Sequence, residues 1–172
     1  GRMMQQKTKK ITVLGLLFAM ACTLSFLESL IPTTGLLPPG VKLGLSNIVP
    51  MFAMLFLGFR SAWTIAILKS AFVLLMRGAV AGFMSISGGM VSLLIMGILV
   101  YSKKLSFTLQ FVSICGAVGH NLGQLAASSF LLTSFTTFAY APILIISGIV
   151  MGLITSAVLF VLLPALKRIC TN

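Results

Sequence analysis

The sequence predicts an all-α integral membrane protein, a bundle of six transmembrane helices with both termini in the cytoplasm. Three observations support this fold class. The 172 residues are 59% hydrophobic and only 8% charged, the mean hydropathy is +1.17, and apolar stretches of membrane-spanning length recur along the chain. A water-soluble surface needs more polar cover than this, because soluble domains are about a quarter charged. Lipid is the remaining solvent.

Six apolar stretches, separated by Pro, Gly or charged residues, indicate the helices in order. They cover residues 11–31, 43–58, 61–80, 85–101, 107–132 and 141–163. Each falls within or near the ~17–25 residues that a tilted span needs. The second stretch is short and contains Pro50, so we expect it to be kinked or to span only part of the membrane.

One membrane domain is expected to fill residues 11–163, and no long linker interrupts it. A basic cytoplasmic segment, residues 1–10, precedes this domain, and a basic cytoplasmic tail, residues 164–172, follows it. Residues 1–2 resemble the remnant of a cleaved tag. A signal peptide is a minor alternative for the start, but the first apolar stretch continues to Ile31, which is too long for one.

The positions of Lys and Arg predict the orientation of the bundle. With the N-terminus inside, nine basic residues lie on the cytoplasmic side, namely Arg2, Lys7, Lys9, Lys10, Arg60, Lys103, Lys104, Lys167 and Arg168. The other three, Lys42, Lys69 and Arg77, lie in or beside the outer half. This asymmetry follows the positive-inside rule and favours six spans over five or seven. Basic residues at the ends of apolar stretches also argue against a nucleic-acid-binding surface.

Ionisable side chains within the apolar stretches are candidates for function, because each is costly in lipid. Glu28 is the only carboxylate, which excludes paired-carboxylate catalysis and an Asp-rich Mg²⁺ site. We expect Glu28 either to contact a ligand or to pair with Lys42 or Arg77. Lys69 lies about 13 Å from the inner end of its helix, whereas Arg77 is close enough to the outer end to reach the headgroups. Three cations against one carboxylate favour an anionic ligand such as a phosphate or carboxylate.

Three polar residues lie together in the fifth apolar stretch. His120 and Gln124 are one helical turn apart and share a face, and Asn121 is adjacent. They could hydrogen-bond to neighbouring helices or form the floor of a binding pocket. We favour the pocket, because a single partner could not satisfy all three side chains. A lone His without a nearby carboxylate or thiol does not indicate a metal site, and no metal or cofactor is expected.

Two segments expected at the same end of the bundle are weaker candidates. Residues Ser85 to Gly89, which include Ser87, are expected to open the fourth helix and to present backbone N–H groups to an anion, or simply to allow close packing. Ser46 and Asn47, at the start of the second helix, could bond a ligand or cap the backbone.

A stripe of small residues runs along the first helix. Gly15, Ala19 and Thr23 are spaced four residues apart, a pattern that permits close approach of another helix. The approaching helix could belong to this bundle or to a partner subunit.

Several strings of residues resemble one family. They are Glu28, Pro38-Pro-Gly-Val-Lys-Leu-Gly-Leu-Ser-Asn47, Arg77 followed by Ser85-Ile-Ser-Gly-Gly-Met-Val-Ser92, and Gly116-Ala-Val-Gly-His-Asn-Leu-Gly-Gln124. Over nearly the whole chain the pattern resembles the Gx transporter family, also described as heptaprenyl diphosphate synthase component I. That family is similar to the substrate-binding S components of energy-coupling-factor (ECF) transporters.

The resemblance implies a six-helix, S-component-like subunit of the cell (cytoplasmic) membrane that captures a vitamin-like compound. It also implies partners, a coupling transmembrane subunit and two ATPase subunits, with the stripe at Gly15, Ala19 and Thr23 as the docking surface. The chain has no Walker A sequence, so an ATP-driven step would need those partners.

The expected function is therefore binding and transport, not catalysis, at a pocket that opens to the extracytoplasmic side. Its expected lining is Glu28, Lys42, Asn47, Lys69, Arg77, Ser87, His120, Asn121 and Gln124. The ligand would be small and anionic or amphiphilic, such as a flavin, a thiamine-like compound, or a quinone or isoprenoid precursor, and membrane lipid is a further partner. A non-catalytic subunit of a polyprenyl diphosphate synthase is the alternative, since chain-elongating prenyltransferases resemble one another in Asp-rich motifs and this chain has no Asp. A structural assembly factor is a third hypothesis.

Overall fold

The computed structural model describes residues 1–32, 42, 44–102 and 106–171. These residues form six α-helices and two 3₁₀-helices and contain no β-strand, which confirms the predicted all-α class. The α-helices are α1 (Arg2–Ser29), α2 (Ile48–Phe56), α3 (Phe59–Arg77), α4 (Ala79–Tyr101), α5 (Leu109–Leu132) and α6 (Ala141–Thr171). The 3₁₀-helices are η1 (Leu45–Asn47), before α2, and η2 (Phe135–Tyr140), before α6.

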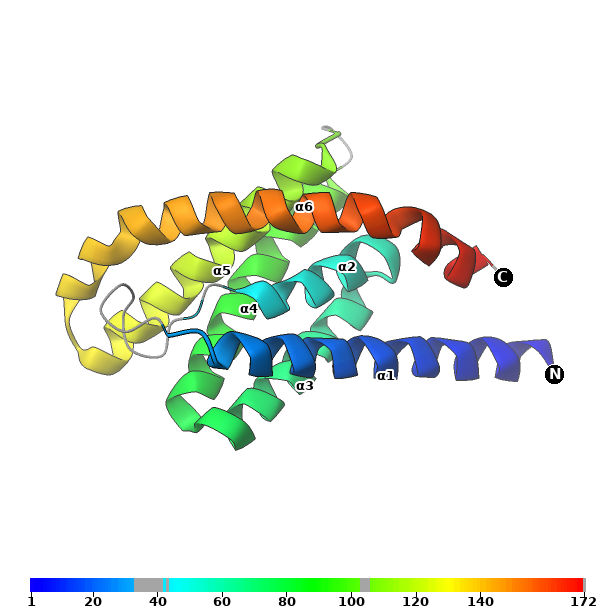
Figure 1. Ribbon diagram of the computed structural model, residues 1–172, viewed down its shortest axis with the longest axis horizontal. Coiled ribbons are helices and arrows are strands. Elements are labelled where there is room, and N and C mark those ends of the chain that lie inside the picture. The colour runs from blue at the N-terminus through cyan, green and yellow to red at the C-terminus, as the bar shows by residue number, and fades with distance from the viewer. Residues whose placement is uncertain (33–41, 43, 103–105, 172) are drawn as a thin grey trace.

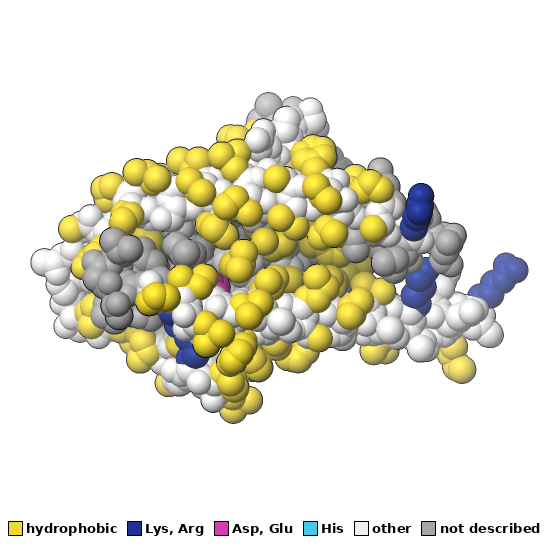
Figure 2. Space-filling view, in the orientation of Figure 1, with side chains coloured by type: hydrophobic (Ala, Val, Ile, Leu, Met, Phe, Trp, Pro, Cys, Tyr) yellow, Lys and Arg dark blue, Asp and Glu magenta, His cyan; other side chains and the backbone are white. Residues whose placement is uncertain are grey.

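The surface of the bundle is that of a membrane protein. Among the described residues, α1, α3, α4 and the segment Phe135–Ala165 are long and apolar enough to cross a membrane. Large apolar side chains remain exposed, such as Leu75 (85%) and Ile146 (62%), and hydrophobic side chains are distributed over the whole length of the face shown in Figure 2. Soluble monomers rarely expose apolar surface so continuously. A multi-pass membrane protein is therefore confirmed, while the count of six crossings stays a prediction.

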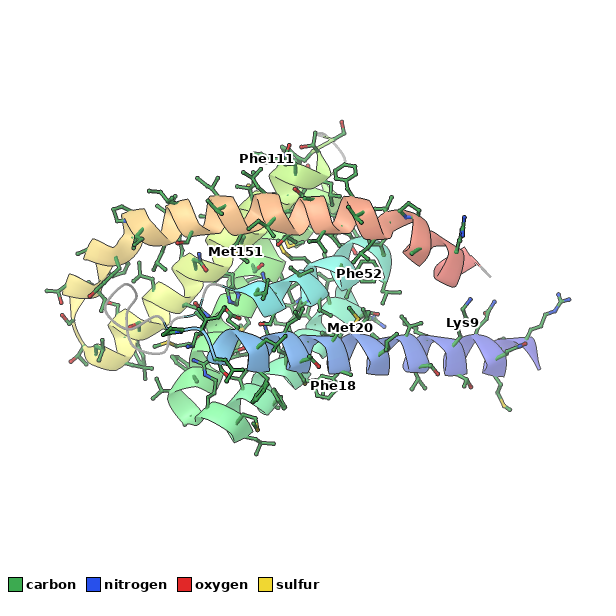
Figure 3. The ribbon with its side chains drawn as sticks, viewed as in Figure 1. Lys9, Phe18, Met20, Phe52, Phe111 and Met151 are labelled. Carbon is green, nitrogen blue, oxygen red and sulfur yellow. The ribbon has the colours of Figure 1, made fainter. Side chains whose placement is uncertain are left out.

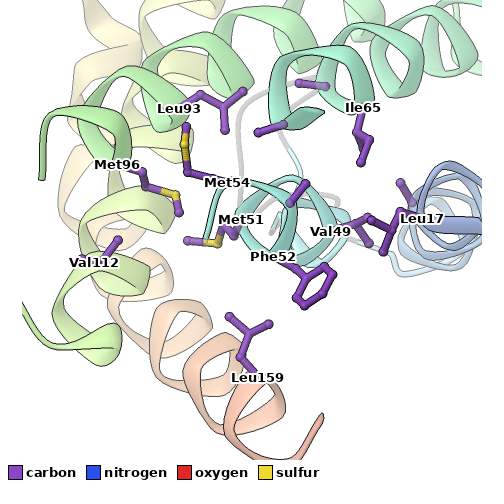
Figure 4. Packing of buried hydrophobic residues seen from close by; sticks show 14 of the residues in the cluster. Leu17, Val49, Met51, Phe52, Met54, Ile65, Leu93, Met96, Val112 and Leu159 are labelled. Atoms are coloured by element: carbon purple, nitrogen blue, oxygen red, sulfur yellow. The ribbon is translucent and has the colours of Figure 1, made fainter. Parts of the chain in front are cut away.

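The short helix α2 forms the centre of the bundle. Its nine residues extend about 14 Å, less than half of a ~30 Å hydrocarbon layer, and its partial span of the membrane stays a prediction. Pro50 lies in its first turn, where proline removes no helical hydrogen bond. Figure 4 shows Leu17 of α1, Ile65 of α3 and Leu159 of α6 directed toward α2. Its short length is tolerated because other helices, not lipid, surround it.

The longer helices pack around α2 in a defined order. α1 contacts α3, α3 contacts α4, α4 contacts α5, and α5 contacts α6, while α2 contacts α1, α3 and α4. The N- and C-termini lie at the same end of the bundle (Figure 1), as an even number of crossings requires. Their cytoplasmic location stays a prediction. Lys103 and Lys104, which contributed to it, and residues 38–41 of the family-like strings lie outside the described residues.

Three helix boundaries differ from the predicted ones by six residues or more. The first helix begins at Arg2, because neither Gly nor Pro interrupts the helix before residue 11, and Lys9 lies on the resulting extension (Figure 3). The fourth begins at Ala79, directly after Gly78, whose φ of +98° separates it from α3. The last continues through Pro164 to Thr171. Apolar stretches locate the spans, but helices continue beyond them into polar segments, and Gly78 determines one of the boundaries.

Candidate functional site

A small polar cavity lies in the half of the bundle remote from the termini. Its volume is about 20 Å³, which is room for about one water molecule. Six of the nine predicted site residues line it, namely Glu28, Lys42, Lys69, Arg77, His120 and Gln124. They come from α1, α3, α5 and the segment before η1, so the fold brings together groups up to 96 positions apart.

The basic residues of the cavity are held at different depths. Lys69, in the middle of α3, is 2% exposed, whereas Arg77, two turns later on the same helix, is half-buried. No hydrogen bond between described residues involves the side chain of either one. With Lys42 they place three cations against the single carboxylate of Glu28, a formal excess of two positive charges around the cavity. Burial of that excess favours an anionic ligand.

Lys42 lies between α1 and η1, outside the spanning helices. Burial lowers the pKa of its ammonium group, and the Arg77 guanidinium lowers this pKa further, while Glu28 acts in the opposite direction. The three groups are therefore close enough to influence one another. Lys42 is half-buried, which leaves part of its side chain in contact with solvent.

Glu28 fixes the backbone that closes the cavity. Its Oε1 accepts a hydrogen bond from the backbone N–H of Gly44. Gly44 has a φ of +89°, and a Cβ there would lie 3.3 Å from Cδ2 of His120, so glycine permits both the conformation and the close approach to α5. The N–H of Lys42 donates a long hydrogen bond, 3.4 Å, to Oε1 of Gln124. The segment before η1 is thus attached to α1 and to α5.

His120 and Gln124 form a pair on one face of α5. The distance between His120 Nε2 and Gln124 Nε2 is 3.2 Å. Because Gln124 uses its oxygen to accept from Lys42, its amide nitrogen donates and His120 Nε2 accepts. The ring proton is thereby assigned to Nδ1, which has no partner among the described residues. The pair provides a neutral, polar floor for the cavity.

Glycines bring α4 against this floor. A Cβ at Gly88 would lie 2.8 Å from the carbonyl oxygen of His120 and 2.9 Å from Cγ of Gln124. A Cβ at Gly123 would lie 2.9 Å from the carbonyl oxygen of Ser87. All three distances are shorter than van der Waals contact, so these positions accept only glycine at the observed helix separation.

Three predicted site residues lie elsewhere. Asn47 donates to Ser92 Oγ of α4 over 3.2 Å, and Asn121 donates to the carbonyl oxygen of Leu144 in α6 over 2.9 Å. Both side chains therefore connect helices. Ser87 does not line the cavity. Its expected place at a helix N-terminus is wrong, because α4 begins at Ala79 and the N–H groups near Ser87 are within the helix.

Three serines line the cavity but were not among the predicted site residues. Ser25 lies one turn before Glu28 on the same face of α1, and this spacing was the available signal. Ser85 of α4 accepts a hydrogen bond from Ser70 over 3.2 Å. Ser46 precedes Asn47, and the structure shows that it is Ser46 that lines the cavity. The hydroxyl groups add donors and acceptors without adding charge.

The small-residue stripe of α1 lies outside the bundle. Gly15, Ala19 and Thr23 are all exposed, and a Cβ at Gly15 would meet no atom within 4 Å. The alternative that this stripe packs within the bundle is therefore wrong. The described residues also contain no group of three His, Cys, Asp or Glu side chains that could hold a metal ion.

A family model described as heptaprenyl diphosphate synthase component I matches residues 17–162. The chain belongs to this family. The description of the heptaprenyl diphosphate synthase component I family names one component of a synthase, which implies a complex of more than one subunit. No curated protein and no solved structure matches the chain. The matched residues include every helix that lines the cavity.

Proposed function

We propose that this chain is the membrane-embedded binding subunit of a multi-subunit complex, of the kind represented by the S components of ECF transporters. In this proposal it captures a small anionic or amphiphilic molecule from the extracytoplasmic side. The observation that carries the proposal is the convergence of Glu28, Lys69, Arg77, His120 and Gln124 on one cavity in an otherwise apolar bundle.

The energetic argument concerns burial without full pairing. A charged group in a membrane interior costs several kcal/mol unless it is paired or hydrated. Lys69 and Arg77 together exceed what Glu28 can neutralise, and Glu28 already accepts from Gly44. Purely structural residues would not leave such an excess, whereas an anionic ligand would balance it. This favours binding over a structural assembly role.

The size of the cavity limits how the ligand can be held. Pockets for vitamin-sized ligands are typically about 300–1,000 Å³, far more than the about 20 Å³ present here. A flavin or thiamine-like cargo would therefore require an open form, in which the segment containing Lys42 and Gly44 lies farther from α5. The two backbone hydrogen bonds to Glu28 and Gln124 are the contacts that such an opening would break.

Partner subunits would supply the steps that this chain lacks. We propose a coupling transmembrane subunit with two ATPase subunits, docked on the exposed stripe of Gly15, Ala19 and Thr23. A non-catalytic membrane subunit of a polyprenyl diphosphate synthase is the second candidate, and the family match favours it. In both proposals the chain binds, and any prenyl transfer is left to another subunit, because a single carboxylate, Glu28, cannot form an Asp-rich Mg²⁺ site.

Native mass spectrometry of the protein in mild detergent would test the proposal. We expect a co-purifying small molecule in the wild type, its loss in Lys69→Met and Arg77→Gln, and its retention in Arg60→Gln. Arg60 is the matched control, because it lies on the same helix as Arg77 but is exposed at the other end. The fluorescence of Trp63, the only tryptophan, would show that each variant is folded.

Two results would contradict the proposal, the first by removing the cavity as the binding site and the second by removing binding itself. One is a ligand that survives both Lys69→Met and Arg77→Gln, and the other is a wild-type protein that neither carries nor takes up any small molecule. To separate the two candidates, the chain would be mixed with a catalytic prenyltransferase. A change in product length would favour the synthase subunit over the transporter subunit.

A further inference from the structure

We propose that the cavity binds the phosphate or diphosphate head of an amphiphile, whose apolar tail leaves the cavity past the turn between α3 and α4 and lies against the membrane. This inference rests on the proposed binding function and specifies its ligand. A ligand of this kind differs from a water-soluble vitamin that would be enclosed entirely within the bundle.

The charge of the cavity selects the head of the ligand. Three cations remain for one carboxylate, and Glu28 is already bonded to the Gly44 backbone. A ligand carrying two negative charges balances the excess. Phosphate monoesters and diphosphates carry two or more negative charges in a compact group, and Arg and Lys are the side chains that bind such groups best. The hydroxyl groups of Ser25 and Ser85 provide additional donors around the cavity.

The volume of the cavity selects against a large head. A volume of about 20 Å³ excludes a ring system, but a tetrahedral phosphate needs only a small adjustment of long side chains. Arg77 and Lys42 are half-buried at the border of the cavity and can move outward. Only the charged head then has to enter the bundle, and the remainder of the ligand stays outside.

The turn between α3 and α4 provides a place for the tail. Arg77 lines the cavity and is the last residue of α3, and its neighbours Met76 (56% exposed) and Val80 (53%) form an apolar rim. A Cβ at Gly78 would meet no atom within 4 Å, so the turn itself is open. The polar cavity and the apolar rim are therefore adjacent, as the two ends of an amphiphile require.

The test measures binding to the full chain in nanodiscs of phosphatidylcholine. The probes are farnesyl diphosphate, farnesol, inorganic diphosphate, phosphatidic acid, riboflavin and thiamine. We expect farnesyl diphosphate to bind about tenfold or more tightly than farnesol or inorganic diphosphate, since each of these lacks one half of the ligand. Lys69→Met should weaken its binding about tenfold or more, and Arg60→Gln should not.

A second pair of variants tests the rim. Met76→Ser should weaken the binding of farnesyl diphosphate and leave the binding of inorganic diphosphate unchanged, because only the tail contacts this side chain. Ile98→Ser is the matched control, an exposed apolar position (71%) near the other end of α4. Equal binding of inorganic diphosphate and farnesyl diphosphate, or equal effects of the two Ser variants, would overturn the proposed path of the tail.

The remaining probes distinguish this inference from the proposed function on which it rests. Phosphatidic acid binding as tightly as farnesyl diphosphate, with the same response to Lys69→Met, would support the phosphate-headed ligand and identify a membrane lipid as its source. If riboflavin or thiamine binds and neither farnesyl diphosphate nor phosphatidic acid does, this inference is overturned, but the proposed binding function stays intact. No binding of any probe, together with no co-purifying molecule, would overturn both.

Discussion

Substitution of Gly88 by Ala should weaken the bundle at the site, and the adjacent Gly89 provides a matched control. Both glycines are buried in α4, so they share helix, depth and burial. A Cβ at Gly88 would lie 2.8 Å from the carbonyl oxygen of His120, while a Cβ at Gly89 would meet its nearest atom, in Ala66, at 3.8 Å. Only the first added methyl group collides with backbone.

The expected magnitude follows from two opposing terms. Replacing Gly by Ala within a helix gains about 1 kcal/mol of helix propensity at either position. Overpacking at Gly88 costs about 1–3 kcal/mol, because α4 and α5 must separate by roughly half an ångström to restore contact distance. The propensity term cancels in the comparison, so Gly88→Ala should be less stable than Gly89→Ala by about 1–3 kcal/mol. At this chain length that corresponds to roughly 2–12 °C in melting temperature.

Thermal unfolding in detergent, followed by Trp63 fluorescence, measures this difference. The contact of Gly88 with Gln124 adds a functional readout, because separation of α4 from α5 displaces the floor of the cavity. Ligand binding should therefore weaken in Gly88→Ala and stay unchanged in Gly89→Ala. Equal melting temperatures for the two variants would refute the close approach of α4 and α5 on which the site depends.

Two further predictions concern the helices around the site. Gly148→Ala should lower the melting temperature, because its Cβ would lie 2.8 Å from Cα of Val118 in α5, and such overpacking costs about 1–3 kcal/mol. Gly15→Ala is the control and should not lower the melting temperature, because its Cβ meets nothing within 4 Å. A lower melting temperature in both variants would contradict this packing of α6 on α5. Asn121→Leu should lower the stability of the bundle by about 1 kcal/mol, because the hydrogen bond to Leu144 is lost, and a binding assay should show unchanged ligand affinity. Loss of affinity at unchanged stability would instead show that Asn121 contacts the ligand.

The sequence predicts the spans well and their limits poorly. Lipid imposes apolar stretches of fixed length, so the stretches at 61–80 and 107–132 correspond closely to α3 and α5. Helix ends instead depend on local backbone, and a single glycine with positive φ, Gly78, decides that α4 begins six residues earlier than predicted. The chain composition contains no signal for that conformation beyond the presence of the glycine itself.

The site was predictable where helix geometry assigns side chains to a face. His120 and Gln124, at i and i+4, both line the cavity, whereas Asn121, one residue on, points toward α6 and bonds Leu144. The role of Gly44 could not be predicted, because its N–H meets Glu28 only after the segment returns into the bundle. Backbone donors of this kind leave no residue-type signature in a sequence.

The position of α5 explains how a membrane bundle can carry this polar site. α5 has the polar centre that lowers its hydropathy, yet it lies between α4 and α6, and glycines on both sides remove the space that lipid would fill. Gly123 and Gly88 close its contact with α4, and Gly148 closes its contact with α6. His120 is thereby shielded from acyl chains, and its side chain lines the cavity. The polar site therefore depends on the glycine contacts, because wider separation of α5 from α4 and α6 would expose its polar side chains to lipid.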